Sequence, residues 1–242
     1  MTNSLNSTVV TFKLDGTPIK PTIDTGSNFL RGVAVDAAGK IYVTDHHGGT
    51  LTTYKADGTA TTPTIRGLSG PDAVAVDAAG KIYVANYNND TLTTYNADGT
   101  PTTPTIRGLR GPLGVAVDTA GKIYVANFQN GSLTTYQADG TPTTPTITKG
   151  LYMPTGVAVD AAGKIYVTDQ QGDTLTTYTA NGTPTKPTIN VSGGPIAVAV
   201  DATGKIYVLD REDLWTYNAD GTPATPSIQP PDLGDPFGVA VH

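Results

Sequence analysis

The sequence predicts an all-β fold, a six-bladed β-propeller of four-stranded antiparallel blades, and one internal repeat carries this prediction. Copies of the segment G-V-A-V-D-A-A-G-K-I-Y-V begin at Gly32 and recur along all 242 residues. The first valine of each copy falls every 41 or 42 residues, at Val33, Val74, Val115, Val157, Val198 and Val239. A repeat of this length is typical of a propeller blade. No segment has the 3.6-residue apolar period of a helix, so the repeats are predicted to be strands.

Each repeat divides into four strands separated by turn signals. The first strand is the apolar run G-V-A-V, which the D-A-A-G turn closes. The second strand, K-I-Y-V, contains β-branched and aromatic residues that favour strands. The third strand is L-T-T-Y, and the D-G pair that follows it predicts a hairpin turn. The fourth strand contains two nearby prolines, which cannot donate to a neighbouring strand, so we expect it at the outer edge.

The repeats predict a single domain over residues 1–242, with five full blades from about 32 to 228. The sixth, closing blade is predicted to be a composite of residues 1–31 and 237–242. Thr8–Phe12 match the third strand, residues 15–23 the fourth, and Phe237–Val241 the first. Met1–Asn3 match only the last residues of a second strand, so we expect that strand to be short or missing. Sharing this blade between the two ends would pin the ring shut and leave no open sheet edges.

The repeat over residues 112–127 resembles a known family. Its first part is P-L-G-V-A-V-D at residues 112–118, and its second part is G-K-I-Y-V-A-N at residues 121–127. Both parts are similar to the motif of the NHL-repeat propellers, and the similarity recurs along essentially the whole chain. The resemblance implies the propeller fold. It does not imply one activity, because propellers of this type include lyases, lactonases and binding modules.

The loops between the second and third strands differ from repeat to repeat, whereas the turns on the opposite face are nearly constant. We interpret this difference either as tolerated drift or as a binding surface. Aromatic, Asn and Gln side chains can stack on and hydrogen-bond to polar ligands such as sugars. The candidate ligand-binding residues in these loops are His46, Tyr87, Asn88, Phe128, Gln129, Gln170, Gln171 and Arg211.

A second variable set opens the first strand of each repeat, one residue before Gly-Val or Ala-Val. In a propeller the first strand lines the central channel, so we expect these residues to form a ring at its mouth. The set consists of Arg31, Asp72, Leu113, Thr155, Ile196 and Phe237. Arg31 and Asp72 lie in adjacent repeats and are further candidates for ligand binding, although they could simply neutralise each other.

Composition argues against several functional classes. A net charge of −6 disfavours nucleic acid, which needs a basic face. No apolar run is long enough to span a membrane, and without cysteine there is no thiolate chemistry. The five aspartates that end the first strands could converge on a cation, but capping of their own turns is the simpler interpretation. They are Asp36, Asp77, Asp118, Asp160 and Asp201.

Catalysis is disfavoured by the shortage of suitable side chains. The related lactonases and lyases imply a metal set or a His and Glu pair, but this chain has one glutamate, Glu212, and three histidines. Glu212 and His46 belong to repeats that are not adjacent, so a direct acid–base pair is not expected. We therefore predict no cofactor, no metal site and no catalytic residue.

The sequence thus predicts a monomeric, non-catalytic binding module for a glycan or protein ligand. One alternative is a metal-dependent lactonase or lyase. Another is a purely structural or designed repeat scaffold, which the near-identity of the repeats favours. The low charge content, the absence of cysteine and the abundance of threonine suit an exported bacterial domain.

Overall fold

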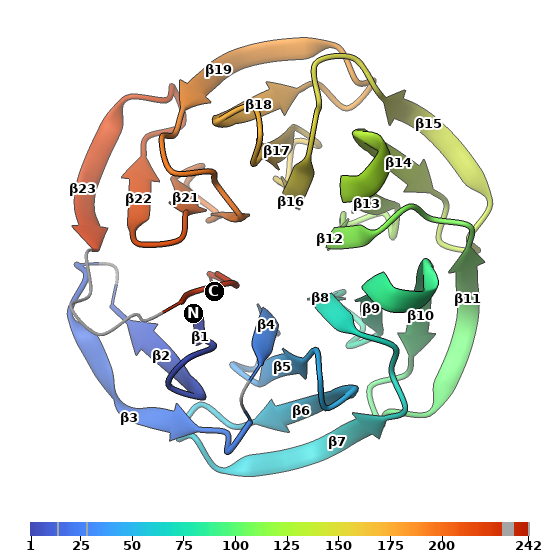
Figure 1. The fold of residues 1–242 in the computed structure, drawn as a ribbon, viewed down its shortest axis with the longest axis vertical. Helices are drawn as coiled ribbons and strands as arrows, with labels where there is room; N and C mark the ends of the chain where they lie inside the picture. The colour runs from blue at the N-terminus through green and yellow to red at the C-terminus, as the bar shows by residue number, and fades with distance from the viewer. Residues whose placement is uncertain (14, 28, 229–234, 242) are drawn as a thin grey trace.

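A computed structural model describes residues 1–13, 15–27, 29–228 and 235–241 as a ring of six antiparallel sheets (Figure 1). Five sheets have four strands and one has three, which confirms the predicted six-bladed propeller. In each complete blade the strands pair in chain order, from the centre of the ring to its rim. In the described part of the chain, no helix is long and apolar enough to cross a membrane.

The five complete blades follow one another along the chain. The first contains β4 (Leu30–Val35), β5 (Ile41–Asp45), β6 (Thr50–Tyr54) and β7 (Ala60–Arg66). The second contains β8 (Pro71–Val76), β9 (Ile82–Asn86), β10 (Thr91–Tyr95) and β11 (Pro101–Arg107). The third contains β12 (Pro112–Val117), β13 (Ile123–Asn127), β14 (Ser132–Tyr136) and β15 (Pro142–Ile147). The fourth contains β16 (Pro154–Val159), β17 (Ile165–Asp169), β18 (Thr174–Tyr178) and β19 (Pro184–Asn190). The fifth contains β20 (Ala197–Val200), β21 (Ile206–Leu209), β22 (Leu214–Tyr217) and β23 (Pro223–Ile228).

The fourth strand of each complete blade lies outermost, as its prolines predicted, and a threonine of the third strand contacts it. Pairing between β14 and β15 shifts register between Leu133 and Thr135. At this irregularity the buried Thr135 hydroxyl lies 2.9 Å from the Thr143 carbonyl and 2.8 Å from the Pro145 carbonyl. The equivalent hydroxyls of the other complete blades make the same contacts, at Thr53, Thr94, Thr177 and Thr216. The second threonine of L-T-T-Y therefore supplies a donor where the regular ladder is interrupted.

The core lies between neighbouring blades. One buried cluster combines Tyr124 and Leu133 of the third blade with Val157, Ile165 and Tyr178 of the fourth. Similar clusters fill the other junctions, because each sheet carries apolar side chains on both faces. The repeated tyrosines of the second and third strands are therefore packing residues.

The aspartate that ends each first strand caps its own turn. Asp118 Oδ1 accepts hydrogen bonds of 2.9 Å from the backbone N–H groups of Ala120 and Lys122. Its Oδ2 accepts a bond of 3.0 Å from the hydroxyl of Tyr124, and Gly121 completes the turn with φ of 81°. The other four copies repeat this arrangement. These carboxylates are thus engaged in local hydrogen bonds, which accords with the capping interpretation.

The remaining blade contains β1 (Thr2–Asn3), β2 (Thr8–Phe12) and β3 (Pro18–Asp24). Its second strand, β1, has only two residues, which confirms that this strand is short. The strand that we expected over Phe237–Val241 is not formed; an isolated bridge joins Asn3 to Pro236 instead. Because β1 is so short, residues 237–241 have no neighbouring strand to pair with along most of their length. Closure of a four-stranded blade stays a prediction.

The two ends of the chain nevertheless touch. The Thr2 N–H donates to the Gly238 carbonyl at 3.1 Å, and the Gly238 N–H donates to the Thr2 hydroxyl at 2.8 Å. An apolar cavity of about 460 Å³ lies beside this contact, lined by side chains that include Val9, Phe12 and Val241. It lies at the blade whose second strand is short.

Candidate functional site

The loops that join second to third strands surround a cavity of about 480 Å³ at the mouth of the channel. Seven of the ten predicted residues line it: Arg31, His46, Asp72, Tyr87, Phe128, Gln170 and Arg211. All six residues that we expected to ring the mouth also line it, which adds Leu113, Thr155, Ile196 and Phe237. The alignment of the repeats therefore predicted the position of this cavity. The part that these residues play in ligand binding stays a prediction.

Three predicted residues, Asn88, Gln129 and Gln171, do not line the cavity and are exposed. Asn88 and Gln129 lie in single 3-10 turns, η1 (Tyr87–Asn89) and η2 (Phe128–Asn130), which the sequence pattern did not predict. In such a turn consecutive side chains point in different directions. Tyr87 and Phe128 line the cavity, whereas Asn88 and Gln129 lie over glycines of the preceding connection.

Two cavity residues, Phe29 and His47, were missed by the sequence interpretation. The Phe29 and His47 rings stack with centroids 3.9 Å apart and an interplanar angle of 17°. Phe29 lies two residues before the mouth residue Arg31, where three other repeats have Gly70, Gly111 and Gly194. An aromatic residue at a position where three of the other five repeats have glycine was a signal that could have identified Phe29.

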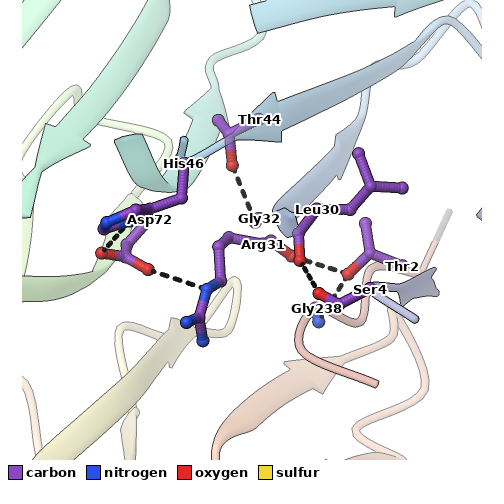
Figure 2. Close-up of polar contacts among 9 residues, drawn as sticks. All are labelled: Thr2, Ser4, Leu30, Arg31, Gly32, Thr44, His46, Asp72 and Gly238. Carbon is purple, nitrogen blue, oxygen red and sulfur yellow. Dashed lines mark hydrogen bonds and ion pairs between the residues drawn. The ribbon is translucent and has the colours of Figure 1, made fainter. Parts of the chain in front are cut away.

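Arg31, His46 and Asp72 form a polar cluster in the lining of the cavity (Figure 2). His46 Nδ1 lies 3.0 Å from Asp72 Oδ2, and Arg31 Nε lies 3.6 Å from Asp72 Oδ1. The Asp72 side chain is only 7% exposed, so its charge is held in a poorly solvated place. The expected pairing of Arg31 with Asp72 is present, but as an ion pair without a hydrogen bond, since Arg31 Nε has no hydrogen-bond partner.

Aromatic rings and backbone contacts hold Arg31 in place. Its guanidinium carbon lies 3.6 Å from the ring centroid of Phe237 and 4.7 Å from that of Phe29. The Arg31 carbonyl accepts a 2.6 Å bond from the Thr2 hydroxyl, as Figure 2 shows. Burial lowers the pKa of the Arg31 guanidinium from its ordinary value, against the opposing attraction of Asp72 and Asp235. The group is therefore a partly desolvated cation.

The other side of the mouth is mostly apolar. Leu113, Ile196 and Phe128 line it and are half-buried. Thr155 belongs to the same ring, but its buried hydroxyl is engaged by the Pro195 carbonyl at 3.0 Å. The ring of first-strand residues at the mouth thus has a charged part, formed by Arg31 and Asp72, and an apolar part that includes Leu113 and Ile196.

Carboxylates elsewhere in these loops are occupied by the loops themselves. Asp169 accepts from the backbone N–H groups of Tyr152 and Met153. Asp210 accepts from the indole N–H of Trp215 at 2.7 Å, so this half-buried tryptophan anchors its loop. Glu212 is exposed and does not line the cavity. Within the described ranges, no group of three or more His, Asp or Glu side chains could hold a metal ion.

Comparison with known proteins identifies the fold alone. No family model matches the chain, and no curated protein matches it. A chain of a nidogen/laminin complex superposes with a TM-score of 0.83 at 18% identity, covering 98% of this chain and 96% of that one. A gluconolactonase from Xanthomonas campestris gives 0.71 at 19% identity, with coverage of 88% and 79%. A streptogramin B lyase gives 0.69 at 15% identity, with coverage of 87% and 72%. This chain is therefore similar in fold to enzymes and to a member of a protein complex.

Proposed function

We propose that the chain is a non-catalytic binding module that takes its ligand in the cavity at the channel mouth. The single observation that carries this proposal is the convergence of the variable side chains. Positions that differ between the repeats meet around one cavity of about 480 Å³, whereas the constant Asp–Tyr turns make up the opposite face. Cavities of about 300–1,000 Å³ are typical of small-ligand sites.

The lining favours a compact ligand with a ring. Tyr87 and Phe128 offer aromatic faces, and Gln170 offers amide groups that donate and accept hydrogen bonds. A saccharide satisfies both requirements, because its ring stacks and its hydroxyls hydrogen-bond. A protein partner docking on the same loops is the other class that we expect, and one fold neighbour comes from a protein complex.

We assign the repeats to the NHL type on their sequence motif, and we propose that the protein acts as a monomer without cofactor or nucleic acid. The argument against catalysis is that the chain has a single glutamate, Glu212. Glu212 lies outside the cavity that contains His46, so the two side chains do not form an acid–base pair there. Lyases and lactonases among the fold neighbours keep the enzyme alternative open to test.

The test is a thermal-shift screen against mono- and oligosaccharides, carboxylic acids, lactones and divalent cations, with and without chelator. A ligand at one hundred times its Kd adds about 2.7 kcal/mol to the free energy of unfolding, which is readily measured. Stabilisation by an organic ligand that Phe128→Ala weakens supports the proposal. Turnover of a lactone, or a shift that a chelator reverses, would overturn it in favour of a metal-dependent enzyme.

A further inference from the structure

The Arg31 side chain is the least satisfied polar group of the cavity. It is only 21% exposed, and its Nε is buried without a hydrogen-bond partner. Asp72 Oδ1 lies 3.6 Å from Nε, which is too long for a hydrogen bond, and Asp72 Oδ2 is occupied by His46. A partly buried cation that is poorly compensated costs free energy, and an anion at its terminal nitrogens would offset part of that cost.

The charge around Arg31 favours an anionic acceptor over a neutral one. Asp72 is the only carboxylate among the described residues that line the cavity, whereas Arg31 and Arg211 contribute two cations. Asp72 and Asp235 offset part of the Arg31 charge through space. An anion would pair with Arg31, whose side chain is only 21% exposed, and charge-assisted hydrogen bonds are stronger than neutral ones.

The geometry of the guanidinium suits a carboxylate. Phe29 and Phe237 contact it at 4.7 and 3.6 Å, which restricts its plane. Figure 2 shows its terminal nitrogens pointing away from both Asp72 and His46, so the forked end is turned outward from its ion-pair partner. A planar carboxylate can accept two parallel N–H bonds from such a fork.

The apolar side chains of the cavity indicate that the rest of the ligand is uncharged. Leu113, Ile196 and Phe128 lie in the same lining as Arg31 and offer no charge. We propose that the ligand is a carboxylate carried by a compact ring, with the carboxylate on Arg31 and the ring against these three side chains. This inference rests on the proposed function and narrows it to one chemical class. The ring can be that of an aryl acid or that of a sugar acid, which share this chemistry.

The experiment uses matched ligands on the full chain, with Kd measured by isothermal titration calorimetry. The probes are phenylacetate, its neutral isostere phenylacetamide, the ringless acetate, and the pair glucuronate and glucose. We expect one of the ring-bearing carboxylates to bind at least tenfold more tightly than its neutral partner and than acetate. The aryl and sugar arms identify the source of the ring.

The Arg31→Gln variant, which removes the charge but keeps hydrogen-bond donors, should weaken binding of that carboxylate at least tenfold. Arg107→Gln, an exposed arginine on the outer strand β11, is the matched control and should leave binding unchanged. Circular dichroism checks the fold of both variants. If Arg31→Gln does not fold, the comparison of carboxylate with amide on the unmodified chain still decides the question.

Equal affinity within both pairs, phenylacetate with phenylacetamide and glucuronate with glucose, would overturn the inference. Carboxylate binding that survives in the folded Arg31→Gln variant would overturn it too. If neutral saccharides bind in the cavity and the carboxylates do not, the inference fails while the proposed function stands. If no compound of the broader screen binds either, the small-ligand function fails together with it.

Discussion

Replacing one turn aspartate tests how the repeat holds its blades. The Asp118→Ala substitution removes three hydrogen bonds at once, from the N–H groups of Ala120 and Lys122 and from the Tyr124 hydroxyl. Water can replace the carboxylate at the two amides, because Ala120 lies exposed and Lys122 half-buried, so we assign about 1 kcal/mol to each. The Tyr124 side chain is almost fully buried and its bond is charge-assisted, which adds about 1–2 kcal/mol.

The substitution should therefore lower the free energy of unfolding by about 3–4 kcal/mol, or Tm by about 10 °C for a chain of this size. Urea denaturation followed by circular dichroism measures the change. Asp118→Asn keeps one acceptor oxygen and should cost about 1 kcal/mol, and Tyr124→Phe isolates the third bond. The double mutant of Asp118→Ala and Tyr124→Phe should show a coupling of about 1–2 kcal/mol. A change within 0.5 kcal/mol for Asp118→Ala, an ordinary surface effect, would refute the claim that the carboxylate caps the turn.

Three further predictions follow from the same structure. Burial, with added effects of Asp201, raises the pKa of Tyr207 to about 12, and the pKa values of Tyr42, Tyr83, Tyr124 and Tyr166 are raised in the same way. Because the unfolded chain releases these protons near pH 10, the free energy of unfolding should be unchanged below pH 10 and should fall as the pH rises toward 12. An alkaline titration followed by tyrosinate absorbance and by circular dichroism measures this. Tyrosinate absorbance that appears well before the circular dichroism signal is lost would contradict the prediction. Tyr87→Ala and Phe128→Ala should each leave the fold intact, since both side chains lie in loops, and a variant that unfolds in a proteolysis assay would show that they belong to the core. Thr135→Val should lower the free energy of unfolding, measured by urea denaturation, by about 1–2 kcal/mol, because it leaves the Thr143 and Pro145 carbonyls without their donor. The control is Thr176→Val, at a half-buried threonine on β18, which should change the free energy of unfolding little.

The fold could be predicted because each blade repeats the same local signals. Apolar alternation, the D-A-A-G turn and the paired prolines fix strand order within a blade, and the spacing fixes the number of blades. The expected strand over Phe237–Val241 failed for a non-local reason. A strand needs a neighbour along its length, and β1 offers only two residues.

The position of the cavity could be predicted from the sequence, but the side-chain contacts within it could not. Alignment of the repeats identified the ring that contains Arg31 and Asp72, because residues at the same place in each blade occupy the same place around the channel. The contact of His46 with Asp72 joins two blades, and repeat alignment carries no information on how the loop of one blade leans toward the next. The same limit hid the stack of Phe29 on His47, which depends on side-chain direction.

The contact between Thr2 and Gly238 has a consequence for the order of folding. It joins residues 236 positions apart, whereas Thr135 and Pro145 within one blade are 10 apart. For a freely flexible chain, loop closure costs about 5 kcal/mol at the first separation and about 2 kcal/mol at the second. Hydrogen bonds of about 1 kcal/mol each do not offset the larger cost until stacked blades have already brought the ends together. The blades should therefore form first and the joint between the ends last, and the amides of Thr2 and Gly238 should exchange with solvent before those of the complete blades.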